Sequence, residues 1–243
     1  MKIFFLIYNE FLYRPLLNLL IWLYNVISIQ DMGIAIIILT LLVRFALYPL
    51  YTKSVKSQRA LQKLQPEIQK IREKYKNEPE KQSKEMMVFY KKNKINPFSG
   101  CLPLIIQLPI LIALFRVFQY GLDPSHLDVL YSFISRPETI NPLFLGLIDL
   151  SVPSLFLAVF AAISQFFQSK MMMVKQNKQK KKKSDFTNMM TQQMTYVMPF
   201  ITFFIAMRLP AALALYWLVT TLFAIAQQYF IMKKRALSPQ KVK

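Results

Sequence analysis

Residues 33–51 read GIAIIILTLLVRFALYPLY, a nearly unbroken apolar stretch that contains one charged residue, Arg44. A helix of this length rises about 28 Å, close to the roughly 30 Å hydrocarbon core of a bilayer. Placing a guanidinium inside that core costs at least ~2.5–3.5 kcal/mol. Arg44 therefore either extends its side chain to the nearer membrane surface or belongs to a functional site within the membrane.

The composition of the whole chain favours a membrane protein over a soluble enzyme. The chain has 243 residues, of which 54% are hydrophobic, and a formal net charge of +19. Four glycines leave no Gly-rich phosphate loop, and the single Cys101 leaves neither a disulfide framework nor a zinc pattern. A basic excess suits nucleic acid or an anionic membrane surface, and the apolar stretches favour the membrane. We expect no catalytic residue, no metal, no cofactor and no DNA partner.

Four further apolar stretches follow the first, at residues 98–120, 152–168, 194–209 and 211–232. The last two meet at a corner formed by Leu209 and Pro210, which predicts a helical hairpin. The fold class that follows is all-α: a polytopic membrane protein with a five-helix transmembrane core. The boundaries we assign to the transmembrane segments are 31–52, 95–120, 152–169 and 192–232, the last of which holds two helices.

The N-terminal residues 1–30 predict an interfacial amphipathic helix. Its polar residues fall on one face, and its apolar residues lie on the other. The polar face consists of Glu10, Arg14, Asn18 and Asn25. A sixth, short transmembrane helix is the alternative for this segment.

Residues 53–94 predict a cytoplasmic antiparallel helical hairpin. Apolar residues recur every three or four positions, a break falls at residues 77–80, and a second apolar face follows. The first face contains Leu61, Leu64, Ile68, Ile71 and Tyr75, and the second contains Met86, Phe89 and Tyr90. Pro66 predicts a kink or a restart of the first helix.

The distribution of positive charge predicts the orientation in the membrane. The hairpin carries 13 Lys and Arg residues, the loop at 170–191 carries 7, and the tail at 233–243 carries 5, out of 31 in the chain. With five spans these three segments lie on one side, which the positive-inside rule makes cytoplasmic. The acidic loop at 121–151 and the N-terminus then lie outside. The basic segments either contact ribosomal RNA or only fix the topology and touch anionic headgroups.

Polar residues are unevenly distributed within the spans. Thr40, Gln107 and Thr220 lie in the middle or in the predicted cytoplasmic half, as do Ser164, Gln165 and Gln168. Each of them alone suits a hydrogen bond between helices. Together they indicate a water-filled groove that is open to the cytoplasm and solvates Arg44 without a counter-ion.

The chain resembles the YidC/Oxa/Alb family of membrane protein insertases over nearly its whole length. The resemblance is carried by LTLLVRFALYPL at 39–50, the charged hairpin, NPFSGCLPLIIQLPILIALF at 96–115, MPFITFFIAMRLPAALALYW at 198–217 and QQYFI at 227–231. It implies that Arg44 is the arginine of a hydrophilic groove, that Gln165 or Gln168 supplies a polar group and that Trp217 supplies an aromatic one. Cys101 and Pro103 match the motif of the second span. Thr220 and Thr221 stand where many members carry Asn, which leaves the polar detail of that helix open.

The resemblance implies an insertase or chaperone of the bacterial inner membrane. A hydrophilic segment of a nascent membrane protein would enter the groove, and the following hydrophobic segment would move laterally into the bilayer. The expected groove residues are Arg44, Thr40, Gln107, Gln165, Gln168, Tyr216, Trp217 and Thr220. The ribosome and the Sec translocon are candidate partners, and we expect a monomer. The alternative is a small anion transporter or channel that uses Arg44 as its binding site.

Overall fold

The computed structural model describes residues 6–93, 95–96, 102–120, 127–172 and 186–236, and it confirms a mostly helical chain. The helices are η1 (Asn9–Tyr13), α2 (Arg14–Val26), α3 (Met32–Ala46), α4 (Tyr48–Lys74), α5 (Pro79–Lys92), α6 (Leu102–Tyr120), α7 (Leu155–Met172), α8 (Phe186–Ala206) and α9 (Ala211–Ala236). The strands of the described residues are β1 (Leu143–Phe144) and β2 (Ile148–Asp149), which pair in an antiparallel ladder.

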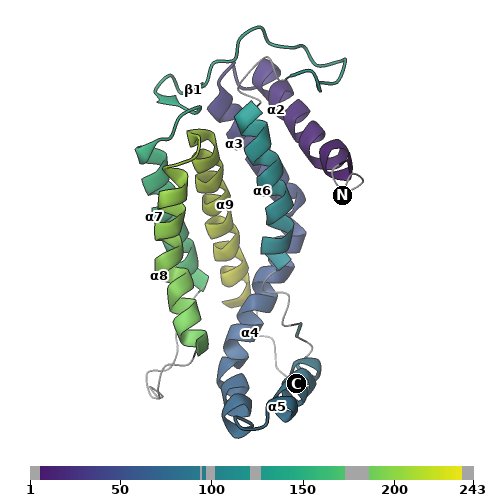
Figure 1. Cartoon of the computed structure of the whole chain (residues 1–243), viewed down its shortest axis with the longest axis vertical. Helices are drawn as coiled ribbons and strands as arrows, with labels where there is room; N and C mark the ends of the chain where they lie inside the picture. Colours follow the sequence, from purple (N-terminus) through teal and green to yellow (C-terminus); the bar gives the residue numbers. More distant parts are fainter. Residues whose placement is uncertain (1–5, 94, 97–101, 121–126, 173–185, 237–243) are drawn as a thin grey trace.

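Helices α3, α6, α7 and α8 pack around α9 in an elongated bundle (Figure 1). Helix α9 occupies its centre and contacts α3, α6, α7 and α8. Residues 211–216 at the start of α9 are mostly small or apolar, and all of them are buried against the neighbouring helices, which suits a central position. The strands and the loop before them cover one end of the bundle, and α4 and α5 extend from the other end (Figure 1).

The outside of the bundle is strongly apolar. Large hydrophobic side chains on several helices are exposed, among them Phe45, Ile105, Phe160, Phe167, Phe200, Phe204 and Phe230. Exposure on this scale is characteristic of a surface that contacts lipid. By length and composition, α7 and α9 among the described helices can cross a membrane, and α3 with α4 makes a third candidate if the bent pair is one span. Shorter apolar helices lie at Ile105–Tyr120 and Thr195–Ala206.

The first apolar stretch is not one straight helix. Helix α3 ends at Ala46, α4 begins at Tyr48, and the two are inclined by 65° at Leu47. The physical reason is Pro49, which has no N–H to donate and whose ring clashes with the carbonyl of Phe45 one turn earlier. The bend places Arg44 in the last turn of α3, whereas a single helix over 33–51 would have placed it well inside the span.

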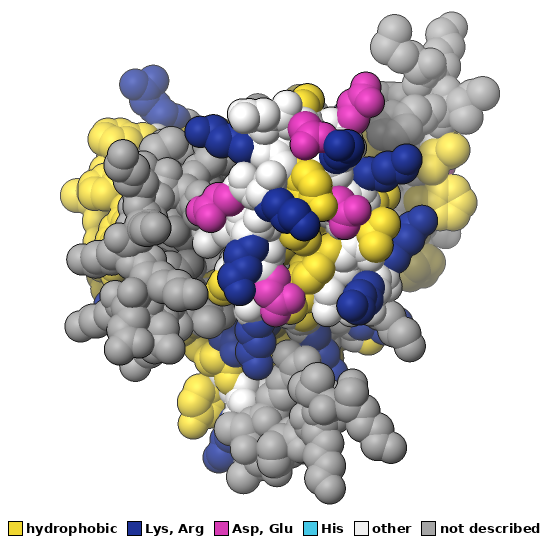
Figure 2. Space-filling model, turned by 90° about the horizontal axis from the view of Figure 1, so that it is seen from below, with side chains coloured by type: hydrophobic (Ala, Val, Ile, Leu, Met, Phe, Trp, Pro, Cys, Tyr) yellow, Lys and Arg dark blue, Asp and Glu magenta, His cyan; other side chains and the backbone are white. Residues whose placement is uncertain are grey.

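Helix α4 continues as one helix through Pro66 to Lys74, so the described structure has no restart there. It turns at residues 75–78 into α5, close to the predicted break. Gln82 of α5 donates from Nε2 to the carbonyl of Arg72 at 3.0 Å, and Ile68 is buried. Seen from this end, Lys and Arg side chains are spread over the hairpin with Asp and Glu among them (Figure 2).

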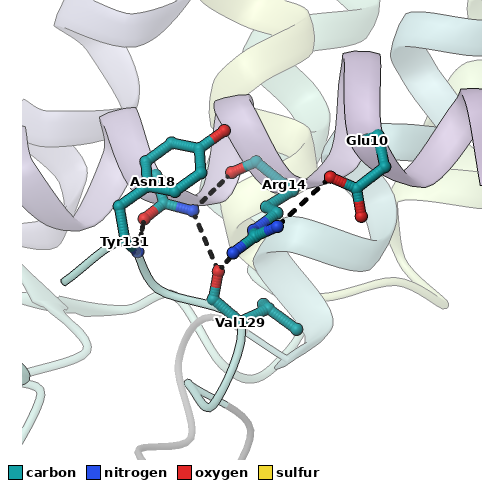
Figure 3. A network of polar contacts seen from close by, with 5 residues as sticks. All are labelled: Glu10, Arg14, Asn18, Val129 and Tyr131. Carbon is teal, nitrogen blue, oxygen red and sulfur yellow. Dashed lines mark hydrogen bonds and ion pairs between the residues drawn. The ribbon is translucent and has the colours of Figure 1, made fainter.

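At the opposite end, the polar face of α2 binds the backbone of the loop between α6 and α7. Asn18 is buried; its Nδ2 donates to the Val129 carbonyl at 3.2 Å and its Oδ1 accepts from the Tyr131 N–H at 2.6 Å (Figure 3). Asn25 likewise donates to the Ser135 carbonyl at 2.7 Å. The polar face that the periodicity predicted therefore holds a segment more than a hundred positions away.

The β1–β2 turn closes over the start of α3. Asp31 caps α3 by accepting from the Ile34 N–H at 2.9 Å, and its second oxygen accepts from the Leu145 N–H at 2.7 Å. Gly33 lies directly beneath Phe144, so closely that a Cβ added at Gly33 would be 2.1 Å from the phenyl ring. One carboxylate and one glycine thus fix the strands on the end of the bundle.

Candidate functional site

Arg44 is enclosed in the bundle, with 6% of its surface exposed. Its guanidinium carbon lies 4.5 Å from the centre of the Tyr51 ring, within the range of a cation–π interaction. The bend at Leu47 makes this contact possible, because it folds the first turns of α4 relative to the end of α3. The charge therefore rests against an aromatic face that belongs to the same apolar stretch.

The hydrogen bonding of Arg44 is incomplete. Nε donates to Oγ1 of Thr220 on α9 at 3.4 Å, which is a long hydrogen bond. Nη1 is buried and has no hydrogen-bond partner among the described residues. The ion pairs found within the described part of the chain do not include Arg44, so no carboxylate there balances its charge. A buried donor in this state can donate a hydrogen bond to a water molecule or to an acceptor on a ligand.

Three further polar side chains form a chain of hydrogen bonds beside Arg44. The Tyr51 hydroxyl donates to Oε1 of Gln107 on α6 at 2.6 Å. The amide of Gln107 in turn donates to the hydroxyl of Tyr216 on α9. Residues from α3, α4, α6 and α9 thus meet in one polar cluster, the Arg44 network, which consists of Arg44, Tyr51, Gln107, Tyr216 and Thr220.

The structure brings some of the expected groove residues into this network and leaves others outside it. Gln107, Tyr216 and Thr220 join Arg44. Thr40 is buried, but its hydroxyl donates to the carbonyl of Ile36 in its own helix at 2.6 Å. The remaining three are Gln165, Gln168 and Trp217, which are half-buried and have no hydrogen bond to the network in the described part of the chain. Cys101 and the side chain of Pro103 lie outside the described residues.

Sequence reasoning missed Tyr51 and Gln227. Gln227 on α9 donates from Nε2 to the Tyr48 carbonyl at 3.1 Å and to Oγ1 of Thr52 at 3.0 Å, so it ties α9 to the first turn of α4. Gln227 begins the stretch 227–231 that carried the family resemblance, and Tyr51 directly follows the stretch 39–50. Their roles depend on the bend at Leu47, which the apolar pattern alone does not reveal.

Comparison with known proteins identifies relatives along almost the entire chain. Residues 22–238 match the family model described as 60Kd inner membrane protein. A membrane protein insertase YidC of Fusobacterium nucleatum is 37% identical over 229 residues, covering 93% of this chain and 100% of the relative. YidC 2 of Bacillus anthracis is 38% identical, and the match covers 93% of this chain and 81% of the relative. YidC of Clostridium perfringens is also 38% identical, and the match covers 86% of this chain and 84% of the relative.

Proposed function

Because this chain belongs to the YidC family of membrane protein insertases, we propose that it receives hydrophilic segments of its substrates at the Arg44 network. Membership makes the chain a multi-pass protein of the bacterial inner membrane that inserts membrane proteins and is not an enzyme. It also decides against the small anion transporter considered above. The proposal for Arg44 extends what the family resemblance implied to the neighbours that contact it, Tyr51, Gln107, Tyr216 and Thr220.

The observation that carries this assignment is the buried and incompletely bonded guanidinium. The partners found for Arg44 among the described residues are uncharged, and Nη1 is a buried donor without an acceptor there. An acidic or polar substrate segment would supply the missing acceptor and the opposite charge. Binding it there lowers the cost of taking that segment out of water, because a polar contact replaces lost hydration.

Entry of a substrate requires the network to open. With 6% of Arg44 exposed, the described conformation is closed around the guanidinium. The Tyr51, Gln107 and Tyr216 side chains form the barrier, and they are joined to one another by neutral hydrogen bonds. Such bonds contribute only about 1 kcal/mol each, so a groove can open without breaking an ion pair. Gln165 and Gln168 on α7 remain our candidates for the wall of the opened groove.

For the topology, we propose five transmembrane helices built from α3 with the start of α4, α6, α7, α8 and α9. The hairpin of α4 and α5 then lies in the cytoplasm, which agrees with its basic surface (Figure 2). The N-terminus and the β1–β2 turn lie outside. Exposed apolar side chains along α6 and α8, such as Leu108 and Phe200, would let a hydrophobic substrate segment move from the network into lipid.

The test is insertion by purified protein in reconstituted vesicles, with substrates whose translocated segments are either acidic or neutral. We expect Arg44→Ala to slow insertion of the acidic substrates about tenfold or more, and Arg44→Lys to be milder because the charge persists. Arg208→Ala is the matched control, because Arg208 is exposed and lies between α8 and α9, away from the network. Equal insertion of acidic substrates by Arg44→Ala and the unaltered chain would refute the assignment.

A further inference from the structure

A second polar site lies at the outer end of the molecule, away from Arg44. It is a cleft of about 460 Å³ between helix η1, the last turns of α6 and Val129 of the outer loop. The other residues that line it are Asn9, Glu10, Tyr13, Arg14, Arg116 and Tyr120. Clefts of this volume accommodate small ligands and headgroup-sized polar groups.

Arg116 contacts two neutral side chains of η1 at the cleft. Its Nη1 donates to Oδ1 of Asn9 at 3.1 Å, and its guanidinium carbon lies 4.7 Å from the centre of the Tyr13 ring. Asn9 and Tyr13 are the first and last residues of η1, the π-helical turn that precedes Pro15. Single π-helical turns of this kind are frequently found at functional sites. These contacts fix the position of the guanidinium while leaving its positive charge in place.

Arg14 forms the second cationic side of the cleft. Its Nε donates to the Val129 carbonyl at 3.1 Å, and its Nη1 lies 3.2 Å from the carboxylate of Glu10 (Figure 3). Glu10 supplies the one carboxylate among the residues that line the cleft. The lining therefore carries two guanidinium groups and one carboxylate, and its fixed geometry suits an anion with several oxygen atoms, such as a phosphate.

The surroundings of the cleft favour a lipid over a soluble anion. Leu6, Ile7 and Phe11, on the same helical segment, are 61%, 54% and 78% exposed. Apolar side chains with this exposure in a membrane protein suit contact with acyl chains. Tyr13 and Tyr120 are of the residue type that concentrates at the headgroup level of membrane proteins. The cationic cleft thus lies next to a surface that would hold the apolar part of the same ligand.

We propose that this cleft binds the phosphate headgroup of an anionic phospholipid, with Arg116 and Arg14 beside the phosphate and Ile7 and Phe11 against the acyl chains. Its assignment to the outer leaflet rests on the topology proposed above; the binding itself does not. The bound lipid would link η1 to α6 and so fix the N-terminal helix on the bundle.

The experiment uses the full chain, purified in detergent and mixed with equal amounts of phosphatidylglycerol and phosphatidylcholine. Native mass spectrometry then measures how many molecules of each lipid are retained. We expect preferential retention of phosphatidylglycerol, a loss of about tenfold in apparent affinity for Arg116→Gln, and little loss for Arg116→Lys. Arg208→Gln is the matched control, since it removes an exposed arginine outside the cleft.

Two outcomes overturn the proposal. The first is equal retention of phosphatidylglycerol by Arg116→Gln, Arg208→Gln and the unaltered chain. The second is competition by glycerol phosphate at the concentration of the lipid, which would make the site one for a soluble phosphate. Thermal unfolding without lipid shows whether Arg116→Gln folds. If it does not, Tyr13→Leu, which removes the aromatic contact of Arg116 but keeps an apolar side chain at this buried position, takes its place with the same expected loss. Insertion by Arg44 variants is a separate readout, so failure here leaves the proposed function unaffected.

Discussion

At the scale of single residues, the energetics of Arg44 explain why it suits a binding role. A guanidinium within the membrane costs at least ~2.5–3.5 kcal/mol. The cation–π contact with the Tyr51 ring stabilises the guanidinium by about 2 kcal/mol when it is shielded from water. The 3.4 Å hydrogen bond to Thr220 is too long to add much. A polar substrate group bound to Nη1 would offset the rest of this cost. No described protein group is bonded to that atom.

Two substitutions of Tyr51 distinguish the hydrogen bond of its hydroxyl from the cation–π contact of its ring. We expect Tyr51→Phe to lower the free energy of unfolding by about 1 kcal/mol, because it removes one hydrogen bond to Gln107 and keeps the ring against Arg44. Tyr51→Leu should cost about 1–2 kcal/mol more, because the cation–π contact is lost as well. Thermal unfolding in a fixed detergent measures both. Indistinguishable melting temperatures for the two variants would argue against the cation–π contact.

Asn18 bonds to the backbone of the loop between α6 and α7 at two positions. Its amide donates to the Arg14 and Val129 carbonyls and accepts from the Tyr131 N–H (Figure 3). Asn18→Ala should cost about 1–3 kcal/mol and speed hydrogen exchange at the Tyr131 amide. Asn18→Asp retains an acceptor for Tyr131 but places a carboxylate against two carbonyls. We therefore expect it to protect the Tyr131 amide better than Asn18→Ala does; faster exchange than in Asn18→Ala would contradict this.

At the scale of elements, the bend between α3 and α4 organises the site. Pro49 prevents one continuous helix, and Gln227 on α9 holds the first turn of α4 through the Tyr48 carbonyl and Thr52. The bend turns Tyr51 toward Arg44 and Gln107. A straight helix over the same residues would have carried the Tyr51 ring further along the axis, one turn or more away from the guanidinium.

Substitutions at Gly33 and Phe144 test how the β1–β2 turn packs on α3. Gly33→Ala places a methyl group 2.1 Å from the Phe144 ring, so we expect a loss of about 1–3 kcal/mol in stability. Phe144→Ala removes the ring and should restore part of that loss. In thermal unfolding, the double variant should therefore lose less than the sum of the two single variants. Strict additivity would mean that the two residues do not touch in the membrane-embedded protein.

At the scale of the whole molecule, charge and apolar surface are separated along the long axis. The exposed apolar side chains of the bundle lie between the α4–α5 hairpin at one end and a cap of loop and strands at the other; Figure 1 shows the two ends. The cap is held by side chains of α2 and by Asp31, so the N-terminal helix belongs to the closed end of the molecule. We therefore expect the proposed groove to open toward the hairpin.

The proposed orientation is tested by cysteine labelling in a chain that carries Cys101→Ser. Leu147, in the turn between the strands, and Lys63, on α4, are both exposed and serve as a matched pair. With a membrane-impermeant maleimide, we expect Leu147→Cys to be labelled in intact cells and Lys63→Cys only in inverted vesicles. Labelling of Lys63→Cys in intact cells would reverse the proposed topology.

The sequence by itself determined the helical class, the apolar segments, the family and Arg44 as a charge within an apolar stretch. These properties depend on local composition and on short motifs, which can be counted along the chain. The tertiary structure alone decided which polar residues meet. Tyr51 pairs with Gln107 across 56 positions, Gln107 with Tyr216 across 109 and Arg44 with Thr220 across 176. It also showed that the polar face of α2 binds the backbone of the loop between α6 and α7. The reason is physical: helical periodicity fixes which face of a segment is polar, whereas the bend at Leu47 and the packing of α9 decide what that face contacts.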